Sequence, residues 1–121
     1  MNPYYEINKI GDVTAIRILR KSTYKELLAV INEIATHHPY HKRLWNISGI
    51  NFDLSLDEIQ QMAMHGKLVY TNPSKVAVVA SDDLAYGEMN QFRVFREQQG
   101  FCSVKQFRDE KNAIEWLNTE D

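Results

Sequence analysis

The stretch "KVAVVAS", residues 75–81, decides the fold class of this chain. Between its polar ends lies an unbroken apolar run over residues 76–80. A strand with one face in water alternates apolar and polar residues, whereas a strand buried on both faces of a parallel sheet is apolar throughout. We therefore interpret this stretch as a central strand of a parallel sheet.

Segments with strand and helix patterns alternate along the rest of the chain. Residues 4–10 and 13–19 show partial alternation and are separated by Gly11 and Asp12, which suit a two-residue hairpin turn. Strands that alternate with helices after this hairpin indicate right-handed crossovers and a mostly parallel sheet. The later segments are expected as a helix over 21–38, a strand over 42–48, a helix over 54–70, the strand over 75–81, a helix over 82–100, a strand over 101–107 and a helix over 108–121.

The expected fold is therefore a single α/β domain over residues 1–121, with the element order β-β-α-β-α-β-α-β-α. Its five-stranded sheet is mostly parallel, and the first strand is antiparallel because a hairpin ties it to the second.

The predicted helices begin with capping residues. Thr23 with Glu26, and Ser55 with Glu58, have the spacing of a capping box. Most such residues only accept hydrogen bonds from the first backbone N–H groups of the helix. A phosphate on Ser55 would, however, also be stabilised at the positive end of the helix. The local sequence leaves open whether Ser55 is a cap or a phosphorylation site.

The composition argues against several classes of protein. Hydrophobic residues make up 44% of the chain and the formal net charge is −2. The lysines and arginines are spread along the sequence, so we expect no basic face for nucleic acid. No apolar run approaches the ~20 residues that span a membrane, and the N-terminus lacks the pattern of a signal peptide. The lone Cys102 fits a reducing compartment, and we expect a cytoplasmic protein.

No pattern indicates an enzyme, a metal site or a cofactor. The chain lacks the nucleophile elbow of serine hydrolases, and no Gly-rich phosphate loop follows a strand. Asp82 and Asp83 stand at a helix start, which favours the ionised form of both and gives acid–base chemistry little support. His37, His38 and His41 have no cysteine or carboxylate partners at a metal-site spacing. We expect no catalytic residue, metal or cofactor.

Polar residues follow the predicted parallel strands, at the edge where the carboxyl ends of the strands meet. Open parallel sheets bind ligands at this edge, and each helix that begins there adds a partial positive charge. We expect a partner-binding edge with Ser55 near its centre. The other residues expected there are Ser48, Asn51, Asp53, Ser81, Asp82 and Asp83.

The second and third predicted helices carry more apolar residues than one inward stripe needs. Such a surplus is typical of a helix covered on two sides, and also of an adaptable binding surface. If these helices part to admit an apolar ligand, a cleft opens between them. The residues expected to line that cleft are Met62, Met64, Leu68, Tyr86 and Phe92.

Three stretches, "HHPYHKRLWNISG", "KVAVVASDDLAYGEMNQF" and "VKQFRDEKNAIEWL", resemble the SpoIIAA-like proteins of the STAS superfamily (sulfate transporter and anti-sigma factor antagonist). The resemblance runs over nearly the whole chain and implies the same α/β fold. In the antagonists, a partner kinase phosphorylates a serine where the helix after the third core strand begins, and Ser55 matches that position. The antagonists usually present an Asp-Ser pair, whereas Leu54 separates Asp53 from Ser55 here.

The SpoIIAA-like subgroup is also similar to CRAL-TRIO-type lipid-binding domains, which implies small apolar ligands and membrane association. Two non-catalytic functions therefore remain open, beside a third, an enzyme that uses Asp82 or Asp83, which no motif supports. The first is a non-catalytic regulatory module of STAS type, which binds a partner protein or ligand and is controlled by phosphorylation of Ser55. The alternative is a carrier or sensor of a small apolar or lipid-like ligand, with transient peripheral contact to a membrane. The ligand, the partner and the formation of a homodimer also stay open.

Overall fold

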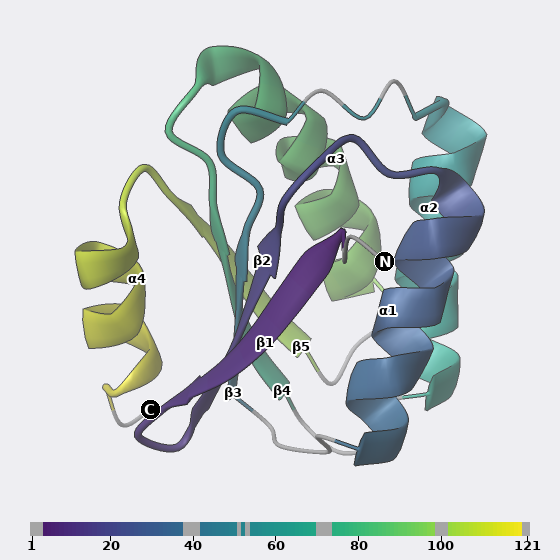
Figure 1. Ribbon diagram of the computed structural model, residues 1–121. Helices are drawn as coiled ribbons and strands as arrows, with labels where there is room; N and C mark the ends of the chain where they lie inside the picture. The colour runs from purple at the N-terminus through teal and green to yellow at the C-terminus, as the bar shows by residue number, and fades with distance from the viewer. Residues whose placement is uncertain are drawn as a thin grey trace.

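The computed structural model describes residues 4–37, 42–50, 52, 54–69, 74–98 and 102–119. Within these residues the chain forms a five-stranded mixed sheet and four helices (Figure 1). The strands are β1 (Tyr5–Ile10), β2 (Val13–Ile18), β3 (Lys42–Asn46), β4 (Ser74–Val79) and β5 (Cys102–Phe107). The helices are α1 (Tyr24–His37), α2 (Leu56–Val69), α3 (Asp83–Gln98) and α4 (Glu110–Leu117).

The first two strands form the predicted antiparallel hairpin. Ile10 lies opposite Val13, so Gly11 and Asp12 make the turn. Gly11 has a φ angle of +62°, which glycine adopts without steric cost. The strands from β2 to β5 all run parallel to one another. The predicted α/β class, the hairpin and the parallel arrangement are confirmed.

The strands lie side by side in chain order, from β1 to β5. Each right-handed crossover therefore moves in the same direction, which puts α1, α2 and α3 on one face of the sheet. α4 follows the last strand and covers the other face (Figure 1). A sheet wound in one direction has no reversal of strand order, so it lacks the crevice that opens at such a reversal.

The strand β4 lies between β3 and β5, and all six of its residues are buried. Val76 and Val78 pack in the core beneath α1, α2 and α3. Ala77 and Val79 pack in the second core, beneath α4. The predicted burial of this strand on both faces is confirmed, and its apolar composition follows from its two helical covers.

The predicted capping box at the start of α1 is confirmed, and α4 also begins at a capping residue. At the start of α1, the Thr23 hydroxyl accepts a hydrogen bond from the Glu26 N–H at 3.1 Å, and the Glu26 carboxylate accepts one from the Thr23 N–H at 2.9 Å. Before α4, Asp109 accepts a hydrogen bond from the Asn112 N–H at 2.8 Å. These bonds satisfy N–H groups that have no partner within the helix, and so define where each helix begins.

Candidate functional site

The carboxyl edge of the sheet brings several of the predicted polar residues together. The Asp82 carboxylate accepts hydrogen bonds from the Gly49 N–H at 2.7 Å and from the Ala85 N–H at 3.2 Å. The Ser48 hydroxyl accepts one from the Ser81 N–H at 3.0 Å. These bonds join the loop after β3 to the loop after β4. The polar groups of this edge are therefore used to hold two loops together.

The hydrogen bond from the Gly49 N–H, followed by that from the Ala85 N–H, lowers the pKa of the Asp82 carboxyl. A lowered pKa keeps the carboxylate charged at neutral pH, where it acts as an acceptor. Asp82 is thus a helix cap and a loop anchor, and its charge state does not suit a general acid.

Arg108 contacts two further residues at this edge, Asp83 and Tyr86. The Arg108 guanidinium donates to the Asp83 carboxylate at 2.8 Å and lies over the Tyr86 ring, 4.1 Å from its centroid. Two further predicted members of this edge, Asn51 and Asp53, lie outside the described residues. The strand order of the described sheet does not reverse, so this edge lacks the crevice that opens at such a reversal.

Ser55 is an exposed residue in a complete capping box at the start of α2. Its hydroxyl accepts a hydrogen bond from the Glu58 N–H at 3.1 Å, and the Glu58 carboxylate accepts one from the Ser55 N–H at 3.0 Å. The geometry establishes the capping role of Ser55. Phosphorylation of this serine stays a prediction.

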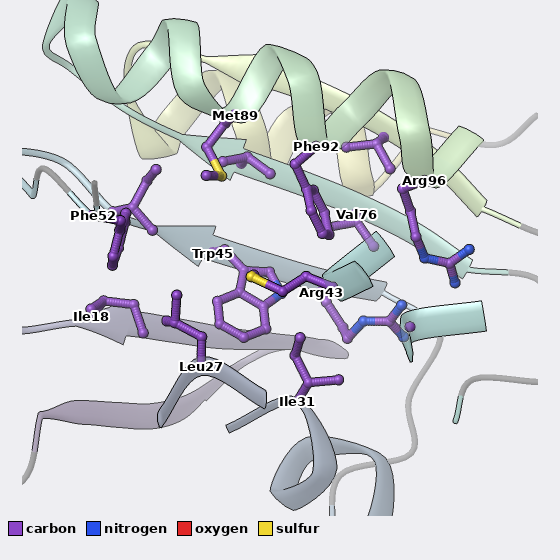
Figure 2. Close-up of a pocket in the computed structure, with 15 residues that line it drawn as sticks. Ile18, Leu27, Ile31, Arg43, Trp45, Phe52, Val76, Met89, Phe92 and Arg96 are labelled. Atoms are coloured by element: carbon purple, nitrogen blue, oxygen red, sulfur yellow. The ribbon is translucent and has the colours of Figure 1, made fainter. Parts of the chain in front are cut away.

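An apolar cavity of about 60 Å³ lies between the sheet and the helices α1, α2 and α3 (Figure 2). The sheet supplies one wall, because residues two apart on a strand point to the same face. The helices supply the opposite wall, and nearly all of the lining is apolar. Its apolar side chains include Ile18, Leu27, Ile47, Phe52, Val78 and Met89.

The structure changes the predicted lining of the cleft. Met62 and Phe92 do line the cavity. Met64 does not, because it lies on the outer side of α2 and is 42% exposed. Tyr86 is also outside the lining, since it packs beneath Arg108 at the carboxyl edge. The side chain of Leu68 lies outside the described part of α2.

Of the lining residues that the sequence did not predict, two are charged, Arg43 and Arg96. Each is only 3% exposed. The sequence patterns that place these two arginines toward the cavity are weak. Arg43 is two residues before Trp45 on β3 and therefore shares its face of the sheet, and Arg96 is four residues after Phe92 on α3 and continues its helical stripe. Charged residues at the ends of apolar stripes are usually read as solvent-exposed, which hides such positions.

Within the described parts of the chain, no group of three or more His, Cys, Asp or Glu side chains is placed to hold a metal ion. His38 and His41 lie outside them, and His37 pairs with Glu33 at 3.8 Å. None of the described helices is long and apolar enough to cross a membrane. Comparisons with protein-family models, with curated proteins and with solved structures find no match.

Proposed function

We propose that this protein is a non-catalytic carrier or sensor that binds a small apolar ligand in the cavity between the sheet and α1–α3. The observation that carries the proposal is the cavity itself, because protein interiors are close-packed and leave few voids larger than a water molecule. An apolar void of about 60 Å³ forgoes packing energy that an apolar ligand would restore.

The helices α2 and α3, which cover the cavity, carry exposed apolar side chains, as expected of helices that separate to admit a ligand. Met64 of α2 and Leu84 and Val94 of α3 are exposed apolar residues, at 42%, 56% and 38%. An engineered apolar cavity of about 150 Å³ holds benzene, so the present space of about 60 Å³ takes a six-carbon ligand only if α2 and α3 separate. Exposed apolar residues on these helices are compatible with transient contact to a membrane during loading.

The second candidate, a regulatory module of STAS type that acts through phosphorylation of Ser55, is favoured by the accessibility of that side chain. Ser55 is exposed at the start of α2, where the helix dipole tolerates a phosphate. The hydrogen bond of Ser55 in the helix cap, and those of Ser48 and Asp82 between the loops, account for these side chains without a switch. This function is therefore the second candidate. Intact mass spectrometry of protein purified from its own cells separates the two, since a phosphate survives denaturation and a carried ligand does not.

The fluorescence of Trp45 tests the first candidate. Trp45 lines the cavity, whereas Trp116 packs against Phe107 on the other face of the sheet. A Trp116→Phe variant leaves Trp45 as the only source of tryptophan fluorescence, and it keeps an aromatic ring beside Lys75. Titration with hexan-1-ol should shift the Trp45 emission with saturation. A Trp45→Phe variant that retains Trp116 is the matched control and should show no saturable change. An unchanged Trp45 emission would contradict ligand binding in the cavity.

A further inference from the structure

The cavity has one charged end. Arg43 on β3 and Arg96 on α3 lie together at one end of it, and Ile18 and Phe52 lie at the other (Figure 2). Arg43 is near the start of its strand and Arg96 is in the last turn of its helix. The charged end is therefore at the amino end of the parallel strands, opposite the loops that carry Ser48 and Asp82.

Both arginines keep their positive charge at physiological pH, because the guanidinium group does not lose its proton in proteins. Each is 97% buried, as only 3% of either residue is exposed. Positive charges beside an apolar space are stabilised most by an anion. A guanidinium also has several N–H donors in one plane, so a partner within the protein still leaves donors that suit a carboxylate.

A buried hydroxyl lies next to this charged end. Thr14 of β2 is directly opposite Arg43 of β3 in the parallel register, so both side chains lie on the cavity face of the sheet. Thr14 is fully buried, and its hydroxyl makes no hydrogen bond to any residue in the described ranges. It lies outside the lining of the cavity itself. This donor adds polar character to the amino end, beside a cavity that is otherwise apolar.

Gly66 of α2 makes room for the guanidinium of Arg96. A Cβ atom at this position would lie 2.9 Å from Nε of Arg96, closer than atoms normally approach. Glycine inside a helix costs about 1 kcal/mol relative to alanine, so a position that keeps it needs a packing reason. Here the missing side chain lets Arg96 lie between α2 and α3 at the end of the cavity.

We propose that the cavity selects a small amphiphile with a carboxylate head. Its carboxylate binds at Arg43 and Arg96, and its alkyl chain points toward Ile18 and Phe52. This inference rests on the proposed function and adds the chemical class of the ligand. Arg96 also lies at the negative end of the α3 dipole, which gives it a structural role even without a ligand. The experiment has to separate these two roles.

The test compares ligands that differ only in the head group. Hexanoate, hexan-1-ol and hexyl phosphate are titrated into the full chain with the Trp116→Phe substitution, and the Trp45 emission is followed. A hydrogen bond to a charged group predicts that hexanoate binds at least about tenfold more tightly than hexan-1-ol. Tighter binding of hexyl phosphate than of hexanoate would overturn the carboxylate assignment.

Substitutions at the charged end then test whether Arg96 binds the carboxylate. Arg96→Met should reduce the preference for hexanoate over hexan-1-ol to about twofold or less, while hexan-1-ol still binds. Gly66→Ala keeps both arginines and displaces the guanidinium, so it should lower the affinity for hexanoate more than for hexan-1-ol. It also serves as the second variant if Arg96→Met does not fold, as judged by circular dichroism.

The remaining outcomes distinguish failure of the carboxylate inference from failure of the proposed function. If hexan-1-ol and hexanoate bind equally to the parent protein, the carboxylate inference is overturned and the proposed function stands. If the preference survives undiminished in both Arg96→Met and Gly66→Ala, Arg96 has only its structural role and the assignment of the carboxylate to both arginines is overturned. If none of the three ligands binds, the proposed function itself fails.

Discussion

The two ends of the sheet use polar side chains in opposite ways. At the carboxyl end, Asp82 and Ser48 accept hydrogen bonds from backbone N–H groups of neighbouring loops. At the amino end, Arg43 and Arg96 are buried beside an apolar cavity. The first arrangement stabilises the fold by joining two loops, whereas the second combines space with charge. A convergence of polar residues in sequence therefore does not by itself indicate a binding site.

Removal of the Asp82 carboxylate should have the largest effect on stability at the carboxyl end. Asp82→Ala loses the hydrogen bonds from Gly49 and Ala85, and we expect the free energy of unfolding to fall by about 2 kcal/mol. Asp82→Asn keeps one acceptor oxygen and should lose about half as much. Urea denaturation of the full chain measures both. An Asp82→Ala variant as stable as the parent would show that this edge does not anchor the loops.

Paired substitutions on β4 compare its two faces. Val78 borders the cavity, whereas Val79 packs in the other core beneath α4. Val79→Ile should destabilise by about 1 to 2 kcal/mol because the added methylene has to displace its neighbours. Val78→Ile should change stability by less than about 1 kcal/mol, since its methylene enters empty space. Equal losses in the two thermal melts would indicate that the cavity is filled in the native protein.

Substitution of Ser55 should have a smaller effect. Ser55→Ala removes the hydroxyl that accepts from the Glu58 N–H and should cost about 1 kcal/mol. Ser55→Asp should leave stability nearly unchanged, because aspartate caps as well as serine. Both values come from urea denaturation. A change in partner binding in Ser55→Asp at unchanged stability would instead support the phosphorylation switch.

Low pH should weaken the carboxyl end. The pKa of Asp82 lies below its usual value of 3.8 in the folded state, chiefly because of the hydrogen bond from the Gly49 N–H. The stability that this carboxylate provides is therefore complete above about pH 4 and is lost as the pH falls through the folded pKa. The difference in urea midpoint between the parent and Asp82→Asn should be smaller at pH 3 than at pH 6. A difference that is independent of pH would contradict the role of the charge.

Much of the fold was predictable because its signals are local. The apolar run of β4, the Gly11–Asp12 turn and the caps at Thr23 and Ser55 each depend on a few neighbouring residues. The element types and the mixed sheet follow from these signals. Boundaries shifted by a few residues, as in β3, which was expected over 42–48 and ends at Asn46.

The site was less predictable because it depends on contacts between distant elements. Met62 and Phe92 lie on the inward stripes of α2 and α3 and could be assigned to the cavity lining. Met64 and Tyr86 could not be placed, since their exposure depends on how the helices pack. The burial of Arg43 and Arg96 also needs tertiary structure, because an arginine at a strand start or in a last helical turn normally reaches solvent.

Ligand binding in the cavity is measured most directly by a methyl NMR titration of the full chain with hexan-1-ol, with ¹³C-labelled methionine methyl groups. Met62 and Met89 line the cavity, and Met64 on the same helix as Met62 is 42% exposed, which makes it an internal control. Ligand binding in the cavity predicts saturable shifts of the Met62 and Met89 signals and little change at Met64. Unchanged signals for Met62 and Met89, or a larger shift at Met64, would contradict ligand binding in the cavity.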